Sequence, residues 1–411
     1  MSDITASKIQ AYAHSALANT GAWVRQFGGR LAGSAANRQT AEALCAALNE
    51  CGAAAAVEPF SAHPDTFNQF YRIHAVLYLM AVAFLWFGYP LVSALIFTLI
   101  IAAVYLQFGR YVELYDRFYP VKTGYNVTAV LEPRGEPRRQ LIFSGHHDSA
   151  QELRFLRKWQ KWYGLRIIVP ELFHLLGALT AWAWVIWTAV FASSPPFGQV
   201  GLGLLTAGTV FVISKIFMFT REVSPGAGDN LIASAIVVEL ARIFAAPDGR
   251  EQSSLAHTRL IFASFDAEEA GLRGSRAWVK ANRKQLQGLP TWALNMDSIY
   301  CEADLQCLTS DLNHHIALDA DLAERCVRIA GACGSPMRLA RMKFGGGATD
   351  AAELARAGVK ATTLLAMSTD VVRDGLVYHT TRDTVEAIDP AAVEACLKIA
   401  VNLAYELDRE A

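Results

Sequence analysis

The chain has 411 residues, of which 53% are hydrophobic and only 18% are charged. Charged residues make up about 25% of an ordinary soluble domain, so this deficit predicts long apolar segments. The formal net charge is -1, which gives no electrostatic reason to expect a nucleic-acid partner. The seven cysteines include no CxxC pair, which favours free, buried thiols in a reducing compartment over disulfides or a cysteine zinc site.

The first elements predicted along the chain are a helix over residues 35–51, from the spacing of its apolar residues, and a strand over residues 54–60. A block without Asp, Glu, Lys or Arg follows over residues 73–108 and breaks at residues 88–90 (GYP), which is a turn signal. Each half is shorter than the ~20 residues that span a bilayer comfortably. The block therefore predicts a tight or partly inserted helical hairpin.

Strands are then predicted at residues 125–131 and 140–144, and the second leads directly into residues 144–149 (SGHHDS). His146 at a strand end can bind a metal, and Asp148 can fix its tautomer. His147 would point to the opposite face of an extended chain, so we expect it not to be a ligand. Taken alone, this motif also occurs by chance.

Residues 153–166 (LRFLRKWQKWYGLR) are cationic and aromatic. They predict a helix that lies on anionic lipid headgroups, with an ordinary amphipathic surface helix as the alternative. A second apolar block covers residues 172–219 and breaks at residues 193–196 (SSPP). Its halves of about 20 residues make it the stronger membrane-spanning prediction. For both blocks the alternative is a pair of buried core hairpins. His174 is either a functional polar group in the membrane or a residue with a packed or interfacial role.

Two hairpins of two helices each would leave the rest of the chain on one side of the membrane. The hairpin turns carry no Lys or Arg, whereas the other side carries many, namely Arg72, Arg110, Lys122, Arg154, Arg157, Lys158, Lys161, Arg166 and Arg221. The positive-inside rule places that side in the cytoplasm. Residues 1–60 hold no apolar segment typical of a secretory signal, which agrees. We expect an integral protein of a bacterial inner membrane.

Residues 224–230 (SPGAGDN) form a loop of small residues from which Asp229 can reach a metal, although an aspartate here is also a common helix N-cap. The following residues 231–244 have the pattern of an amphipathic helix. Residues 265–275 (FDAEEAGLRGS) follow a predicted buried strand at 260–265. Of the adjacent Glu268 and Glu269, one can bind a metal while the other acts as a general base.

Two further motifs complete the set. Asp297 ends a predicted strand at residues 294–297, and residues 378–384 (YHTTRDT) bring His379 together with Tyr378, which can donate to an oxyanion. Each motif alone is ordinary. Together they supply two histidines, three carboxylates and one spare glutamate without a thiolate, which suits catalytic zinc. Two zinc ions about 3.5–4 Å apart, bridged by a carboxylate and a water, need about this many groups.

In their order, these motifs resemble those of the co-catalytic dizinc aminopeptidase family, which includes bacterial and yeast vacuolar aminopeptidases and, more distantly, glutamate carboxypeptidase and glutaminyl cyclase. The resemblance covers about residues 25–60 and 121–411, including residues 30–34 (RLAGS), 348–350 (ATD) and 357–359 (AGV). It implies an α/β fold of the zinc exopeptidase kind, with a mixed, mostly parallel central sheet flanked by helices, and the alternating strands and helices agree. The apolar hairpins depart from the soluble members.

The resemblance also implies the metal ligands. Asp229 would bridge two zinc ions per chain, of which one is also bound by His146 and Asp297. Glu269 and His379 would complete the ligands of the other ion. No ligand position of the family pattern is missing, which argues against an inactive relative.

For catalysis, the resemblance implies that Glu268 is the general base, that Asp148 orients His146, and that Tyr378 lies on the oxyanion side. The implied function is removal of N-terminal residues from peptides by a membrane-embedded zinc metallopeptidase. Open alternatives are a carboxypeptidase, a dipeptidase or a single-zinc glutaminyl cyclase on the same scaffold, and, in another class, a non-catalytic membrane scaffold or transport protein.

The expected partners are a peptide substrate and the lipid bilayer, and the oligomeric state is left open. The sequence predicts a catalytic domain on the cytoplasmic side that is built from residues 1–70, 111–165 and 221–411. Transmembrane hairpin one would cover residues 71–110, and transmembrane hairpin two residues 166–220.

Overall fold

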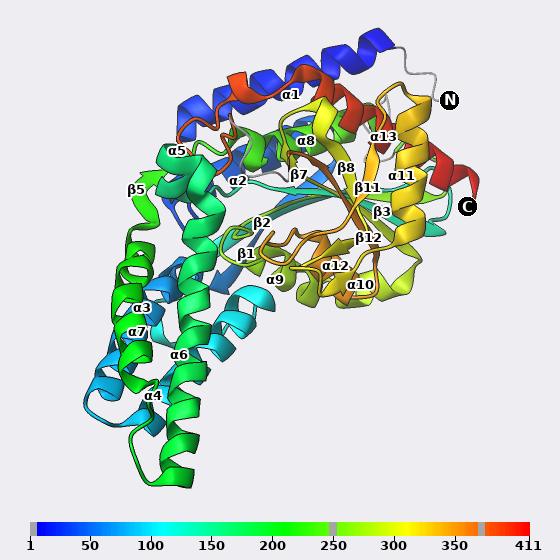
Figure 1. Ribbon diagram of the computed structural model, residues 1–411. Helices are drawn as coiled ribbons and strands as arrows, with labels where there is room; N and C mark the ends of the chain where they lie inside the picture. Colours follow the sequence, from blue (N-terminus) through cyan, green and yellow to red (C-terminus); the bar gives the residue numbers. More distant parts are fainter. Residues whose placement is uncertain (1–5, 246–252, 369–374) are drawn as a thin grey trace.

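The computed structural model describes residues 6–245, 253–368 and 375–411. A helical bundle projects from an α/β body, as Figure 1 shows. The described helices of the body are α1 (Ala6–Phe27), α2 (Ala35–Glu50), α5 (Arg154–Trp159), α8 (Ile232–Phe244), α9 (Arg273–Ala281), α10 (Arg283–Gly288), α11 (Ala320–Ala332), α12 (Ala351–Arg356) and α13 (Pro390–Arg409). The strands are β1 (Ala54–Ala62), β2 (Lys122–Leu131), β3 (Arg139–His146), β4 (Gln151–Leu153), β5 (Phe219–Val223), β6 (Thr258–Phe265), β7 (Thr291–Ile299), β8 (Leu305–Leu308), β9 (Ser310–Asp311), β10 (Ile316–Ala317), β11 (Arg338–Ala340) and β12 (Lys360–Ala366).

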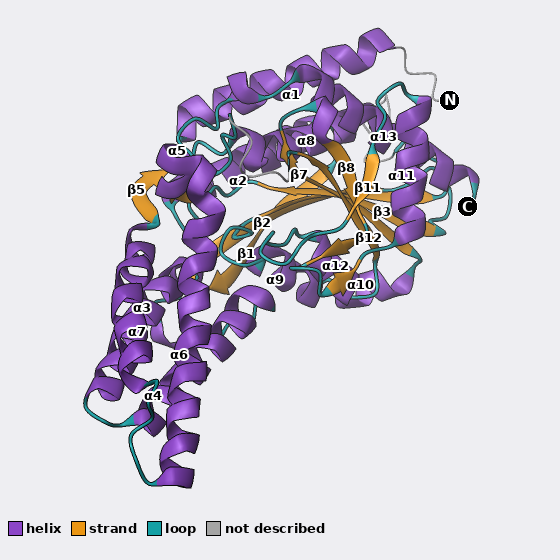
Figure 2. Ribbon diagram, in the orientation of Figure 1, coloured by secondary structure: helices purple, strands orange, loops and turns teal. Residues whose placement is uncertain are grey.

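In the described part of the chain, eight strands form one mixed sheet in the order β1-β2-β6-β3-β7-β12-β8-β11. The central strands β6, β3, β7 and β12 run parallel to their neighbours within this group, whereas β2 is antiparallel to both β1 and β6. Helices cover both faces of the sheet, as Figure 2 shows: α1, α2, α8, α11 and α13 on one, α9, α10 and α12 on the other. The predicted fold class is confirmed.

The predicted strands all form, and most extend a few residues beyond the predicted ends. The strands at the centre of the sheet form from continuous apolar segments, because β3 and β6 are buried along almost their whole length. Such strands lie between two helical layers and read as continuous hydrophobic segments.

The helix predicted after Asp229 forms as α8, but its surroundings are not those of an amphipathic helix. Every residue from Ile232 to Ala241 is buried, and so is Phe244. The helix packs between strand β3 and the helices α1, α2 and α13. Contacts with distant segments therefore bury the side that the pattern assigned to solvent.

Hairpin one consists of α3 (Asp65–Trp86) and α4 (Pro90–Val104), which continues as a π-helical turn, η1 (Tyr105–Gly109). The break lies where predicted, because Gly88 adopts a left-handed conformation and Pro90 begins the second helix. Helix α3 begins at Asp65, before the uncharged block, so the first half is longer than predicted.

Hairpin two consists of α6 (Tyr163–Phe191) and α7 (Gly198–Ser214), and its break also lies where predicted. The four helices of the two hairpins pack around a core that includes Tyr78, Phe97, Ala181 and Leu205. The alternative of hairpins buried in the body is therefore wrong, since the bundle has a core of its own and projects from the body.

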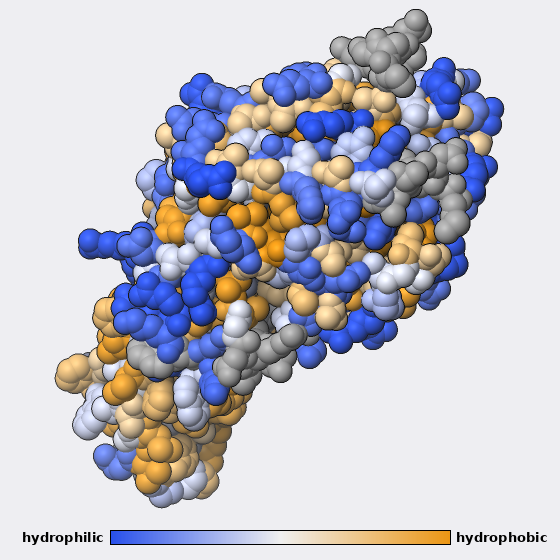
Figure 3. Space-filling view, turned by 90° about the horizontal axis from the view of Figure 1, so that it is seen from above, coloured by the Kyte–Doolittle hydropathy of each residue, from blue (hydrophilic) through white to orange (hydrophobic). Residues whose placement is uncertain are grey.

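The outer surface of the bundle is apolar. Val210 is 72% exposed and Val190 is 66% exposed, and both lie on membrane-length helices. Figure 3 shows hydrophobic residues gathered over the projecting bundle, whereas hydrophilic residues cover most of the body. Among the described residues, four helices are long and apolar enough to cross a membrane: Asp65–Trp86, Pro90–Gly109, Gln160–Phe191 and Gly198–Phe217.

The helix predicted over residues 153–166 is wrong. Residues 153–166 do not form a single helix, because β4 ends at Leu153, the short α5 and a 3-10 turn follow, and α6 begins at Tyr163. Phe155 and Leu156 are buried against Met218 in a small cluster of their own. These apolar side chains hold the base of hairpin two rather than face outward.

His174 is buried inside the bundle. Its Nδ1 lies 2.9 Å from a carboxylate oxygen of Glu171, and Lys215 contacts the same carboxylate. The packed alternative for His174 is therefore supported by an ion pair and a hydrogen bond within the bundle.

Candidate active site

The ligand candidates gather at one edge of the sheet because three neighbouring strands run parallel. His146 ends β3 and lies opposite Phe265, the last residue of β6. Glu268 and Glu269 follow β6 directly, and Asp297 lies near the end of β7, on the other side of β3. The carboxyl ends of parallel strands are where such sheets place their sites.

A first group of potential metal ligands contains His146, Glu268 and Asp297, whose ligand atoms lie within 4.8 Å of one another. Nε2 of His146 lies 3.8 Å from Oε2 of Glu268 and 4.0 Å from Oδ2 of Asp297. All three side chains are buried or nearly so. His146 therefore meets two carboxylates that lie about 120 and 150 residues further along the chain.

A second group contains Asp229, Glu269 and His379, again within 4.8 Å of one another. Nε2 of His379 lies 3.0 Å from Oδ2 of Asp229 and 3.0 Å from Oε1 of Glu269. The other oxygen of Asp229, Oδ1, lies 3.4 Å from Nε2 of His146. Asp229 thus faces the first group with one oxygen and the second group with the other.

The N-cap alternative for Asp229 is wrong. Leu231 occupies the N-cap position of α8, and Asp229 lies within the preceding turn η5 (Ala227–Leu231) with non-helical backbone angles. Its carboxylate faces the two histidines instead of the first amides of the helix.

Asp148 is buried between the two ligand motifs. Its Oδ1 lies 3.3 Å from Nδ1 of His146, as expected for a residue that orients an imidazole. The same carboxylate also accepts hydrogen bonds from the backbone amides of Glu268 (3.1 Å) and Glu269 (3.2 Å). This second contact was not predicted.

Arg30 is fully buried and holds two of these loops together. Its guanidinium donates to the carbonyl of His147 at 2.7 Å and to those of Pro225 and Gly226 at 2.6 and 2.8 Å. The sequence contained a signal for Arg30, since residues 30–34 belong to the family pattern, but no role could be read from it.

Two buried carboxylates were also not predicted as site residues. Asp383 accepts hydrogen bonds from the amides of Gly228 (2.8 Å) and Asp229 (3.3 Å), so it shapes the loop of the central aspartate. Asp350 is buried, and burial raises its pKa to about 7. Both lie in quoted motifs, residues 378–384 and 348–350, without an assigned role.

Tyr378 stacks on His379, with ring centroids 3.7 Å apart and ring planes at 17°. Its ring also packs against the cluster at the base of hairpin two, which includes Leu153 and Met218. The backbone amide of Leu153 donates to the carbonyl of His379 at 2.9 Å. The base of hairpin two therefore borders the site.

His147 lies outside both groups, as expected. Its Nδ1 lies 2.8 Å from the hydroxyl of Ser264, and burial lowers its pKa to about 3. Its contact with Ser264, outside both ligand groups, is consistent with packing rather than metal binding.

The electrostatics of the cluster fit a bound cation. Burial and neighbouring carboxylates raise the pKa of Glu268 and Asp297 well above ordinary values, and the pKa of Glu269 to about 7. Oδ2 of Asp229 and Oε1 of Glu269 are both buried and both face Nε2 of His379 at 3.0 Å. Buried carboxylates crowded in this way are stabilised by metal ions, and nitrogen and oxygen donors without thiolates suit zinc.

Comparison with known proteins agrees with this chemistry. Residues 214–404 match the sequence model of peptidase family M28, a range that holds the ligand candidates except His146. No curated protein matches the chain in sequence.

Similar solved structures include a zinc aminopeptidase from Bacillus subtilis (13% identity, TM-score 0.55), covering 96% of this chain and 95% of that chain. The aminopeptidase from Aneurinibacillus sp. strain AM-1 has 13% identity and a TM-score of 0.54, with 97% and 95% covered. Porphyromonas gingivalis glutaminyl cyclase has 15% identity and a TM-score of 0.55, with 96% and 98% covered. At these identities the likeness shows the fold. The family M28 match over residues 214–404 and the shared fold together support a zinc peptidase or a related enzyme.

Proposed function

We propose that the protein is a membrane-embedded aminopeptidase that holds two zinc ions and removes N-terminal residues from peptides. The observation that carries the proposal is the position of Asp229, whose two carboxylate oxygens face His146 and His379 separately. A carboxylate in this position can bridge two metal ions, and a two-metal site is a well-established means of hydrolysing acyl bonds.

The ligand assignment follows the order of the motifs in the family pattern, and the position of Asp229 between the two histidines supports it. Oδ1 of Asp229 lies 3.4 Å from Nε2 of His146, and its Oδ2 lies 3.0 Å from Nε2 of His379. His146, Asp229 and Asp297 would then hold one ion, and Asp229, Glu269 and His379 the other. Glu268 is then left beside the ions as a carboxylate that is not needed as a ligand.

In the mechanism, Glu268 accepts the proton of the attacking water and later donates it to the leaving amine. Two zinc ions, when bound, acidify that water and polarise the scissile carbonyl. Burial of Glu268 raises its pKa, which suits a group that must both accept and release a proton.

Asp148 and Tyr378 assist the reaction. Asp148 keeps His146 oriented and, through the amide of Glu268, fixes the base. The Tyr378 hydroxyl donates a hydrogen bond to the oxyanion of the tetrahedral intermediate. Stacking on His379 limits the freedom of the Tyr378 ring.

Membrane embedding is supported by the bundle. Its four helices expose large apolar side chains such as Leu99, Leu179 and Val210, which would be costly in water over so wide a surface. The hairpin turns lack Lys and Arg, so the positive-inside rule puts the catalytic domain on the cytoplasmic side. We keep the division into a catalytic domain and two hairpins, but hairpin one begins at Asp65 and hairpin two at Tyr163.

Glutaminyl cyclase activity is the second candidate, because solved structures with this fold include cyclases. A digest of a peptide library by the zinc-loaded protein, with free and acetylated N-termini compared, separates the candidates. Release of N-terminal residues from free peptides alone supports the aminopeptidase. Cleavage of acetylated peptides at the carboxyl end indicates a carboxypeptidase. A cyclase is indicated if N-terminal glutamine loses ammonia without peptide cleavage and the protein holds one zinc per chain.

A further inference from the structure

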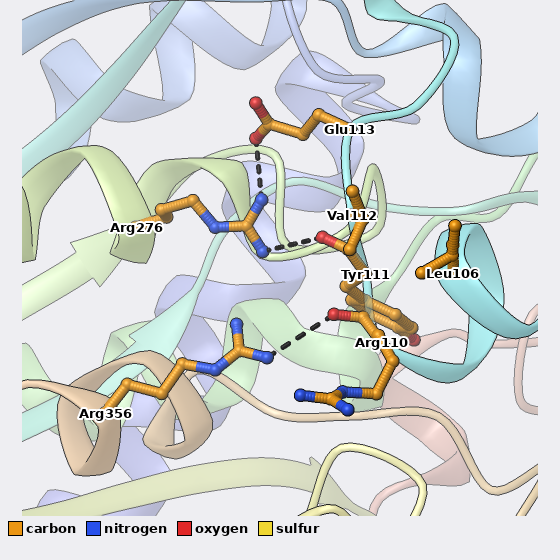
Figure 4. Close-up of a pocket in the computed structure, with 7 residues that line it drawn as sticks. All are labelled: Leu106, Arg110, Tyr111, Val112, Glu113, Arg276 and Arg356. Carbon is orange, nitrogen blue, oxygen red and sulfur yellow. Dashed lines mark hydrogen bonds and ion pairs between the residues drawn. The ribbon is translucent and has the colours of Figure 1, made fainter.

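A cavity of about 450 Å³ opens where hairpin one rejoins the body. This volume falls within the range of about 300–1,000 Å³ that small ligands occupy in proteins. Its wall comes from the end of hairpin one, from α9 and from α12, and Figure 4 shows the residues that line it: Leu106, Arg110, Tyr111, Val112, Glu113, Arg276 and Arg356.

Two of the lining arginines are held in place by carboxylates. Arg276 donates to Glu113 at 2.7 Å, to Glu353 at 2.9 Å and to the carbonyl of Tyr111 at 3.0 Å. Arg356 donates to the same Glu353 at 2.6 Å. The two carboxylates of Glu113 and Glu353 therefore hold these two guanidinium groups in place and balance their charge.

The third arginine, Arg110, has no carboxylate partner among the described residues. Its guanidinium reaches only the hydroxyl of Tyr105, at 3.4 Å, while its own carbonyl accepts from Arg356 at 3.4 Å. Figure 4 shows the guanidinium group of Arg356 directed toward the backbone carbonyl of Arg110. An anion in the cavity could accept paired hydrogen bonds from the guanidinium groups that line it.

The cavity lies at the expected level of the membrane surface. Arg110 directly follows the apolar helix Pro90–Gly109, and Leu106, in the last turn of that helix, lines the cavity wall. Val112, Leu114 and Phe118 are exposed in the segment that follows. Arginines just beyond a spanning helix, beside exposed apolar side chains, are typical of contact with lipid headgroups.

We propose that this cavity binds the phosphate of an anionic phospholipid headgroup, with Arg110 as its cationic partner, Arg276 and Arg356 as further N–H donors, and Leu106 beside the acyl chains. The inference rests on the proposed membrane embedding. An anionic lipid is favoured over a zwitterionic one because an ammonium group would meet the same arginines. The lipid would tie the end of hairpin one to α9 and α12.

Native mass spectrometry of the full-length, zinc-loaded protein in detergent tests the proposal, with phosphatidylglycerol and phosphatidylcholine as probes. We expect one retained phosphatidylglycerol per chain, preferred over phosphatidylcholine. Arg110→Ala should weaken the binding of phosphatidylglycerol about tenfold or more. The affinity of Arg110→Lys should lie between those of Arg110→Ala and the unchanged protein, because lysine keeps the charge but not the planar guanidinium group. Arg328→Ala, on the distant α11, is the matched control and should bind like the unchanged protein.

Three results would overturn the inference. If Arg110→Ala retained as much phosphatidylglycerol as the unchanged protein, the proposed lipid site would be refuted, whereas membrane embedding would be unaffected. Displacement of the lipid by inorganic phosphate alone would identify a soluble anion as the ligand. Release of the protein from membranes by alkaline carbonate without detergent would instead contradict the embedding on which the site depends.

Discussion

The carboxylate of Asp148 accepts a hydrogen bond from the backbone amide of Glu268 at 3.1 Å. The same carboxylate lies 3.3 Å from Nδ1 of His146. One buried residue therefore positions both a proposed zinc ligand and the proposed general base. This links metal affinity to the placement of the base.

Asp148→Asn should therefore weaken zinc binding and slow turnover together. Loss of a partner that orients a ligating histidine costs about 10–100-fold in metal affinity or activity. We expect kcat to fall more than KM changes, because the substrate does not touch Asp148. Zinc competition against a chelator and steady-state kinetics measure this, with the exposed Asp321→Asn as control. Unchanged zinc affinity and kcat would contradict the role of Asp148.

Arg30→Met should destabilise the protein. The variant leaves the buried carbonyls of His147, Pro225 and Gly226 without their donor, and each unsatisfied buried group costs about 1–3 kcal/mol. We expect the free energy of unfolding in detergent to fall by at least about 3 kcal/mol. Arg38→Ala removes an exposed ion pair with Glu42 and should change it little. Equal free energies of unfolding for Arg30→Met and Arg38→Ala would refute the stabilising role of Arg30.

Glu152 connects hairpin two with the loop of His379. Its carboxylate accepts from the amide of Thr381 at 3.3 Å and from the hydroxyls of Thr381 and Thr220 at 3.0 and 2.9 Å. Glu152→Ala should lower activity about tenfold through the second zinc site, and Glu152→Gln should retain more because it can still accept. The exposed Glu222→Ala on β5 is the control. Full zinc occupancy and activity in Glu152→Ala would show that hairpin two does not support the site.

Asp311 predicts a pH dependence of stability. It is buried, accepts from Thr349 N at 3.0 Å, and has a pKa raised by burial from 3.8 to about 6, with Glu353 adding to this. Between these values the folded state binds more protons than the unfolded state, so stability falls as pH rises from about 4 to about 6. The change is on the order of 3 kcal/mol. Asp311→Asn should lack this part of the pH dependence in thermal unfolding, and an identical pH profile would contradict the account.

The motifs at strand ends could be predicted because each follows a buried apolar strand. His146 and Asp297 end such strands and Glu268 follows one, and adjacent parallel strands bring their carboxyl ends together. The hairpins could be predicted because their long uncharged segments are recognised from local composition alone.

What could not be predicted depends on contacts between distant segments. Three of the carbonyls that accept from the Arg30 guanidinium lie 117 to 196 residues away, and Asp383 accepts from amides 154 and 155 residues away. The split of residues 153–166 follows from Phe155 packing on Met218, again far apart in sequence. The arginine cavity joins three such segments, so no local pattern contains it.

Glu268→Gln tests the central claim most directly. Amide and carboxylate have nearly the same shape, so we predict that the variant binds two zinc ions per chain like the unchanged protein. Its kcat on a peptide with a free N-terminus should fall about 100-fold or more, because glutamine cannot accept the proton of the attacking water. The measurement is zinc content and kcat on the same sample, with the exposed Glu42→Gln as control. Two bound zinc ions with near-normal turnover would contradict the account.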